Sequence, residues 1–161
     1  MNLSDKELLE YSKEHIGYEL DMFRQSFIVL KSKKEFDWVT RMSLIESLLN
    51  HSRVLLNFTY PDPSNIRNDD ILAEHYFDNP KDWNKIRPEL SENLKKLRKR
   101  VGKELAHLTA ERISGTPPEK GYPDGWFNEV WKTLQLFAQK ASTKKLNKET
   151  VDILSKTLDN S

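Results

Sequence analysis

Arg100 and His107 are the residues of this sequence whose types and spacing best suit a chemical step. They are seven residues apart in a strongly helical segment, and seven residues turn an α-helix by about 700°. The two side chains therefore fall within about 20° of each other on one helix face. Arginine is an always-charged phosphate ligand, and histidine can move a proton near pH 7. This combination suits metal-independent cleavage of RNA.

Arg100 and His107 are about 10 Å apart along the helix axis. This separation leaves room for a phosphodiester between their side chains. Arg100 would neutralise the charge that grows on the phosphorane oxygens. His107 would take the 2′-hydroxyl proton or protonate the departing 5′-oxygen. The products would be a 2′,3′-cyclic phosphate and a 5′-hydroxyl. Ordinary helix-surface pairing is the alternative, since Glu104 and Glu111 follow the two residues at i+4.

A basic cluster precedes the histidine, formed by Lys95, Lys96, Arg98, Lys99, Arg100 and Lys103. Within it, Lys96, Lys99 and Lys103 are candidates for contacts with RNA, and a solvated helix face is the competing interpretation. The formal net charge of the whole chain is only +1, which argues against wholesale, salt-driven nucleic-acid binding. Any RNA contact is therefore expected to be local.

Composition excludes several classes of protein. The length of 161 residues fits one domain with a single core, and the chain has no cysteine for a disulfide, a catalytic thiol or a thiolate metal site. The four histidines are dispersed and no glycine-rich phosphate loop is present, so neither a metal site nor a cofactor is expected. There is no apolar run of membrane-spanning length and no signal peptide, so a cytoplasmic protein is expected.

Hydrophobic periodicity predicts an all-α, up-and-down bundle of four to five helices in one domain spanning residues 1–161. Ser4 and Glu7 form a capping box at the start of the first helix. Pro88 lies in the first turns of the third helix, which either tolerates it or restarts there. The expected helices span about residues 5–32, 35–60, 82–113, 124–141 and 147–158.

A long connection at residues 61–82 separates the second helix from the third, with a possible short helix at 71–77. Such connections are often functional, although a packed crossover loop is equally consistent with the sequence. The second helix is expected to bury a stripe that begins at Trp38, and the four tryptophans are interpreted as packing residues. The stripe contains Trp38, Met42, Ile45, Leu49, Ser52 and Leu56.

The segment from Arg100 to His107 resembles the signature of the HEPN superfamily (higher eukaryotes and prokaryotes nucleotide-binding domains). That signature is an arginine, four to six residues and a histidine on a late helix of an α-bundle, and here six residues intervene. The resemblance implies a metal-independent RNase whose homodimer joins two Arg–His pairs in one composite site. It also implies a toxin or defence effector, with an antitoxin or another protein as partner. Other members are noncatalytic nucleotide-binding or protein-interaction modules, and that alternative stays open.

Members of this family often add a polar residue from the second helix to the site. Here Arg53 and Asn57 are the candidates, in a polar strip that also contains Glu46 and Asn50. Glu104 is a further supporting candidate on the flank of Arg100. Simple solvation of the helix surface is the competing interpretation of these residues.

Overall fold

The computed structural model describes residues 3–32, 34–104 and 124–156, with residues 103 and 104 described by their backbone only. Every regular element in these ranges is a helix, and they contain no strand. The all-α fold class predicted from the periodicity is therefore confirmed. The part of the third helix predicted at residues 105–113 and the end of the last helix at 157–158 lie outside the described residues.

The first long helix runs without a break from Asp5 to Lys31 and consists of three parts. These are α1 (Asp5–Tyr11), a π-helical segment η1 (Ser12–Ile16) and α2 (Gly17–Lys31). The predicted capping box is present, because Ser4 and Glu7 each accept a hydrogen bond from the other's backbone amide.

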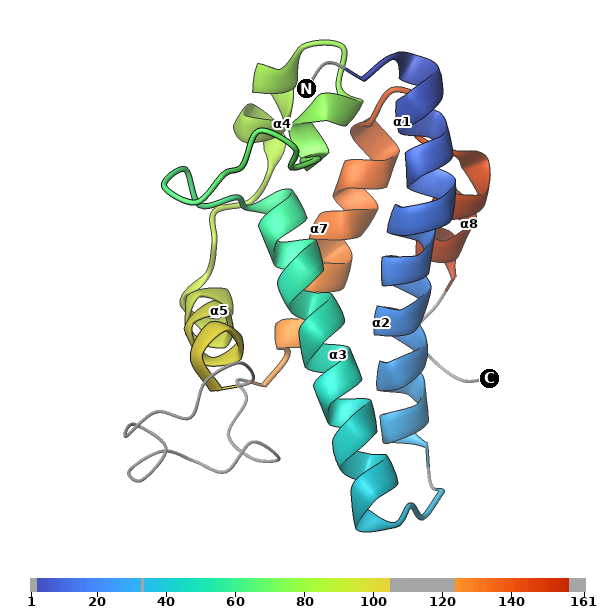
Figure 1. The fold of residues 1–161 in the computed structure, drawn as a ribbon, viewed down its shortest axis with the longest axis vertical. Coiled ribbons are helices and arrows are strands. Elements are labelled where there is room, and N and C mark those ends of the chain that lie inside the picture. Colours follow the sequence, from blue (N-terminus) through green and yellow to red (C-terminus); the bar gives the residue numbers. More distant parts are fainter. Residues whose placement is uncertain (1–2, 33, 105–123, 157–161) are drawn as a thin grey trace.

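Helix α3 (Trp38–Thr59) runs antiparallel to α2 and begins three residues later than predicted. Its start is fixed by Asp37, whose carboxylate accepts a hydrogen bond from the Thr40 amide at 3.0 Å. The buried stripe predicted from Trp38 is wrong at its first residue, since Trp38 is 74% exposed. The first turns of α3 lie at the end of the α2–α3 hairpin, beyond the neighbouring helices (Figure 1). Full burial on α3 begins only at Leu48.

Of the two possibilities left open at Pro88 in the helix predicted at 82–113, the structure shows the restart and not one continuous helix. The chain forms a 3₁₀ turn η2 (Ala73–Tyr76) and a short helix α4 (Pro80–Ile86), and then leaves the helical conformation at Arg87. Pro88 explains the break, because a proline disfavours helical geometry in the residue before it. Ile86, expected on the buried stripe, is 39% exposed. Helix α5 (Glu92–Glu104) begins after Ser91.

The helices form a bundle in which α2, α3 and α7 (Trp126–Lys140) lie side by side, and α8 (Lys148–Ser155) packs on α2 and α7. The up-and-down order holds for α2 and α3. Helix α5, however, lies across the bundle, and α7 runs in the same direction as α3 (Figure 1). In Figure 1 the extended segment between α4 and α5 runs back along the bundle as far as its middle, and α7 starts at that level, so α7 can run parallel to α3.

Aromatic side chains fill the core between the long helices. Phe23 and Phe27 of α2 stack on Phe127 of α7, with ring centroids 4.5 and 3.6 Å apart. Trp83 of α4 is buried against Phe137 and donates its indole N–H to the Thr59 carbonyl at 3.0 Å. The contacts of Trp83 attach α4 to α3 and α7.

Candidate functional site

Arg100 lies on helix α5 beside the residues that anchor this helix to the bundle. Leu94, Leu97 and Val101 are buried, and α5 packs on α3 and α7. Arg100 precedes Val101, so it lies about 100° around the helix from that buried position. Its side chain is half-buried. The aliphatic stem of Arg100 thus borders the core at the edge of the buried stripe.

The rotation of α5 about its own axis is fixed at its first turn. Ser91 caps the helix by accepting a hydrogen bond from the Leu94 amide at 3.2 Å, and its hydroxyl also donates to the Glu129 carboxylate of α7. The other oxygen of Glu129 accepts a hydrogen bond from the Asn93 amide group at 3.2 Å. Asn93 is seven residues before Arg100 and therefore shares its helix face. The Arg100 flank is accordingly the one turned toward the start of α7.

The other residues of the predicted cleavage site are described only in part. His107 falls in the segment 105–123, outside the described residues, and so do the side chains of Lys103 and Glu104. The Arg100–His107 pair therefore stays a prediction. Lys96 and Lys99 are exposed on α5.

Arg98, in the middle of the basic cluster, has a structural role. Its guanidinium donates hydrogen bonds to the Leu56 carbonyl at 3.1 Å and to the Tyr60 carbonyl. The Leu56 carbonyl also accepts the Tyr60 amide at 2.8 Å, whereas the Tyr60 carbonyl follows the last turn of α3 and lies beyond the intrahelical hydrogen bonds. Arg98 thus caps α3 and joins it to α5, and its charge is favourable at a helix C-terminus.

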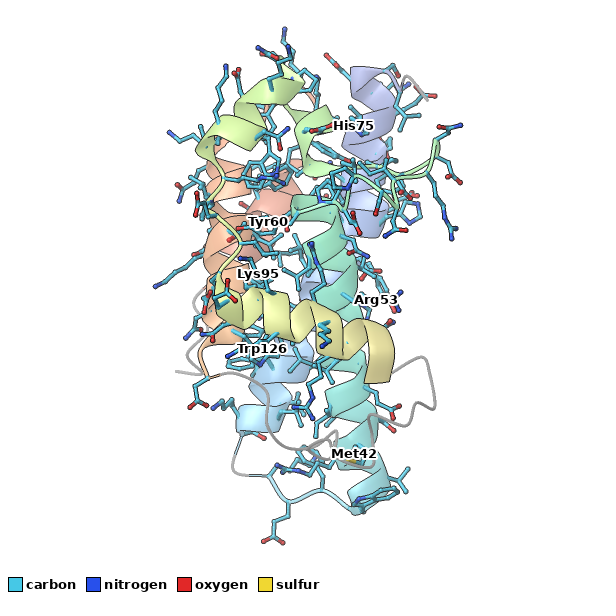
Figure 2. All side chains as sticks on the ribbon, turned by 90° about the vertical axis from the view of Figure 1, so that its left-hand side faces the viewer. Met42, Arg53, Tyr60, His75, Lys95 and Trp126 are labelled. Atoms are coloured by element: carbon cyan, nitrogen blue, oxygen red, sulfur yellow. The ribbon has the colours of Figure 1, made fainter. Side chains whose placement is uncertain are left out.

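Arg53 and Asn57 are exposed on α3 and line a groove of about 850 Å³. Arg98 and Gly102 of α5 line the same groove, and Figure 2 shows Arg53 beside the C-terminal half of α5. Among the described residues, Arg100 is not part of the lining. Arg98 and Gly102 lie on the opposite flank of α5, so the described side chains do not bring Arg53 and Asn57 together with Arg100.

Two further segments complete the groove. Tyr11, His15 and Glu19 contribute from the first long helix, and Arg67 and Asp70 from the loop after α3. The loop is held by its own hydrogen bonds, including one from the Arg67 amide to the Asp70 carboxylate at 2.8 Å. The predicted connection at 61–82 therefore has a specific position, as one wall of this groove.

Sequence reasoning missed the contribution of the first helix to the groove. Tyr11 and His15 are four residues apart, a spacing that places side chains together on a helix, and their ring centroids are 4.6 Å apart. That signal was available in the sequence. The contact between Glu19 and His51 was not, because 32 residues separate them.

The remaining histidines do not form a metal site. His15 is exposed, His51 is buried against Glu19, and His75 accepts a hydrogen bond from the Leu72 amide at 3.1 Å. Within residues 3–32, 34–104 and 124–156, no group of three or more potential ligands is arranged to hold a metal ion.

Comparison with protein-family models, curated proteins and solved structures gives no match for this chain. In the part of the chain that the structure describes, no helix combines the length and apolar character needed to cross a membrane.

Proposed function

We propose that this chain is a metal-independent endoribonuclease of the HEPN type, with Arg100 as the phosphate ligand and His107 as the general acid and base. The observation that most supports the proposal is the half-buried position of Arg100 at the edge of the buried stripe of α5. A charge that borders a low-dielectric core interacts more strongly with a phosphate than a fully solvated one. The HEPN resemblance supplies the histidine and the reaction class.

The proposed reaction is an attack of the ribose 2′-oxygen on the adjacent phosphorus, with departure of the 5′-oxygen of the next nucleotide. Arg100 stabilises the dianionic phosphorane, whose charge exceeds that of the ground state. His107 transfers the proton from the attacking oxygen or to the leaving oxygen. Lys96, Lys99 and Lys103 contact neighbouring phosphates and hold the strand along α5.

The proposed active form is a homodimer in which two Arg–His pairs face each other. Within the proposal, Glu104 orients the guanidinium of Arg100. Such an enzyme would act in the cytoplasm as a toxin or defence effector, restrained by an antitoxin or another protein partner. A noncatalytic nucleotide-binding or protein-interaction module is the alternative if no RNA is cleaved.

The test is RNA cleavage by the purified protein in excess EDTA, with product ends analysed for 2′,3′-cyclic phosphate. We expect cleavage by the wild type and its loss, by at least about a hundredfold, in both Arg100→Ala and His107→Ala. Arg41→Ala is the matched control, because Arg41 is an exposed arginine in the first turns of α3, on a different helix from Arg100.

Three outcomes would contradict the proposal. Cleavage that persists in His107→Ala would exclude this histidine as the proton carrier. Products with 3′-hydroxyl ends would indicate a different reaction. Intact RNA with the wild type across structured, single-stranded and transfer RNA would favour the noncatalytic alternative.

A further inference from the structure

The free end of the α2–α3 hairpin carries the most exposed large apolar side chains of the described residues. Trp38 is 74% and Val39 is 63% exposed, and they are neighbours in the first turn of α3. This end projects beyond the other described helices in Figure 1, and Met42, one turn further along α3, lies near the same end in Figure 2. Single exposed apolar residues are ordinary, but two together at a projecting tip indicate a contact surface.

The apolar surface continues from this tip toward the bundle. Met42 and Ile45 follow Trp38 at four and seven residues, so the three side chains lie within about 60° on one face of α3. Met42 and Ile45 are half-buried. Ile45 lines a groove of about 380 Å³ together with Phe27 and Leu30 of α2. Trp38 therefore lies at the outer end of an apolar strip.

Basic side chains border the apolar strip on both helices. Lys31 of α2 and Arg41 of α3 are exposed and belong to the lining of the same groove. Arg41 is three residues after Trp38 and lies about 60° from it around the helix. Among the described lining residues, these two cations stand against one carboxylate, Asp124 at the start of α7. The groove and the tip thus combine apolar side chains with an excess of positive charge.

The turn between the two helices adds to this charge. The Lys34 ammonium lies 5.5 Å from the centre of the Phe36 ring. Residues 31–41 contain four lysines or arginines and two acids, a net charge of +2, whereas the formal net charge of the whole chain is +1. Of the two acids, Asp37 is engaged as the N-cap of α3, and Glu35 is exposed. This end of the molecule is therefore electrostatically complementary to an anionic surface.

We propose that the free end of the α2–α3 hairpin binds the surface of an anionic lipid bilayer. Trp38 and Val39 enter the interfacial layer, where an indole ring is favoured because it is apolar and carries one polar N–H. Lys31, Lys34 and Arg41 contact the anionic headgroups. The contact is peripheral and reversible, since one aromatic anchor and a few cations give modest affinity. The inference goes beyond RNA cleavage, because none of these residues belongs to the proposed cleavage site.

The shape and charge of the hairpin end favour a bilayer over a protein partner or a second copy of the chain. Trp38 and Val39 point about 100° apart around α3, so the tip is apolar on more than one side. A fluid lipid layer can surround such a tip, whereas a folded protein would need a matching cavity. Two copies meeting tip to tip would bring like charges together, which opposes their association.

Binding is measured by flotation of the full chain with two kinds of vesicle. One kind contains phosphatidylcholine and phosphatidylglycerol at about 7:3, and the other contains phosphatidylcholine alone. We expect binding to the anionic vesicles that weakens as the salt concentration rises. Trp38→Ser should weaken this binding about tenfold or more, and Lys34→Gln and Arg41→Gln about fivefold each.

Fluorescence identifies the inserted side chain directly. The other three tryptophans, Trp83, Trp126 and Trp131, are buried in the bundle. Lipids with brominated acyl chains quench only indoles that reach the bilayer, so they should quench the emission of Trp38 alone. Trp38→Phe should lose this quenching and keep most of the vesicle binding, because phenylalanine retains an apolar ring.

Two matched variants at the opposite end of the bundle separate the tip from the general surface. Ile86 is an exposed apolar residue and Lys81 an exposed cation of α4 (Figure 1). Ile86→Ser and Lys81→Gln should bind the vesicles as the wild type does. Thermal unfolding of each variant checks the fold. Trp38→Ser should leave RNA cleavage in solution unchanged, so this proposal and the cleavage proposal fail separately.

The bilayer proposal is overturned if the wild type floats with neither kind of vesicle, or if Trp38→Ser binds the anionic vesicles as tightly as Ile86→Ser. Vesicle binding without quenching by brominated lipids would also overturn it, because Trp38 would then stay outside the bilayer. If no vesicle is bound, sedimentation distinguishes the other occupants. A dimer that dissociates in Trp38→Ser would identify a second copy, and a monomer would indicate a different protein.

Discussion

His51 Nδ1 lies 2.7 Å from a carboxylate oxygen of Glu19 and joins α3 to α2. The two side chains are only 9% and 24% exposed. The ring of Tyr18 packs edge-on against the imidazole, with centroids 5.6 Å apart. This contact fixes the register of the α2–α3 hairpin, and it does so directly behind the groove that Glu19 lines.

The Glu19–His51 contact should therefore stabilise the fold measurably. We expect Glu19→Leu and His51→Phe each to lower the free energy of unfolding, because each leaves the other polar group largely shielded from water without its partner. A double-mutant cycle by urea denaturation should give a coupling energy of about 1.5–3 kcal/mol. Strictly additive effects would mean that the contact does not contribute.

Arg98→Met should destabilise the protein by about 1.5–3 kcal/mol, since the Tyr60 carbonyl loses its charged donor and the Leu56 carbonyl keeps only the Tyr60 amide. Methionine preserves most of the apolar stem, so the change reports mainly on the guanidinium. Lys99→Met, on the exposed face of the same helix, is the control and should stay within about 0.5 kcal/mol of the wild type. Equal stabilities for the two variants would contradict the capping role.

Gly102→Ala should stabilise the chain by up to about 1 kcal/mol, because glycine is a poor helix former and the added methyl group meets no neighbour within 4 Å. Gly125→Ala should do the opposite and cost roughly 1–2 kcal/mol, since Gly125 has a left-handed φ of 75°. Thermal unfolding of the two variants compares them directly. Stabilisation by Gly125→Ala would show that the left-handed turn before α7 is not required.

Titration of His75 should lower the free energy of unfolding at acidic pH. Burial lowers the pKa of its imidazole below the ordinary value of 6.5, so the folded chain resists a proton that the unfolded chain accepts. Its contribution is therefore complete above pH 6.5 and is lost as the pH falls toward the folded-state pKa. His75→Asn keeps an acceptor for the Leu72 amide but cannot titrate. Its melting temperature, measured between pH 7 and pH 5, should fall less than that of the wild type.

Local signals in the sequence predicted much of the fold. The capping box formed by Ser4 and Glu7 depends on residues close in sequence, and it is present. The helical periods located the first long helix, α3 and α7 to within a few residues, but not the start of α5. Their arrangement was harder to predict, because the crosswise α5 and the parallel α3 and α7 depend on contacts between distant segments.

The errors have identifiable physical causes. Trp38 has the correct helical spacing for the core, but the α2–α3 hairpin extends past the helices that would cover it. The helical spacing of apolar residues continues from Ile86 past Pro88, but the backbone leaves the helical conformation at Arg87. In the sequence, Arg98 is one of six cations in the basic cluster. Only the tertiary structure brings the end of α3 within hydrogen-bonding distance of its guanidinium. For the candidate site, the sequence identified Arg53 and Asn57 but not the groove that they share with Tyr11.

The π-helical segment at Ser12–Ile16 determines how the first helix could change length. Such a segment holds one residue more than α-helical winding requires, so deletion of one residue there would restore an uninterrupted α-helix. The turns before it would then keep their present faces relative to α2, because the wider π-helical turn is what absorbs the extra residue. Leu8 would stay in the core, and Tyr11 would still face the groove. A one-residue deletion elsewhere in α1 or α2 would instead rotate one part of the helix against the other by about 100°.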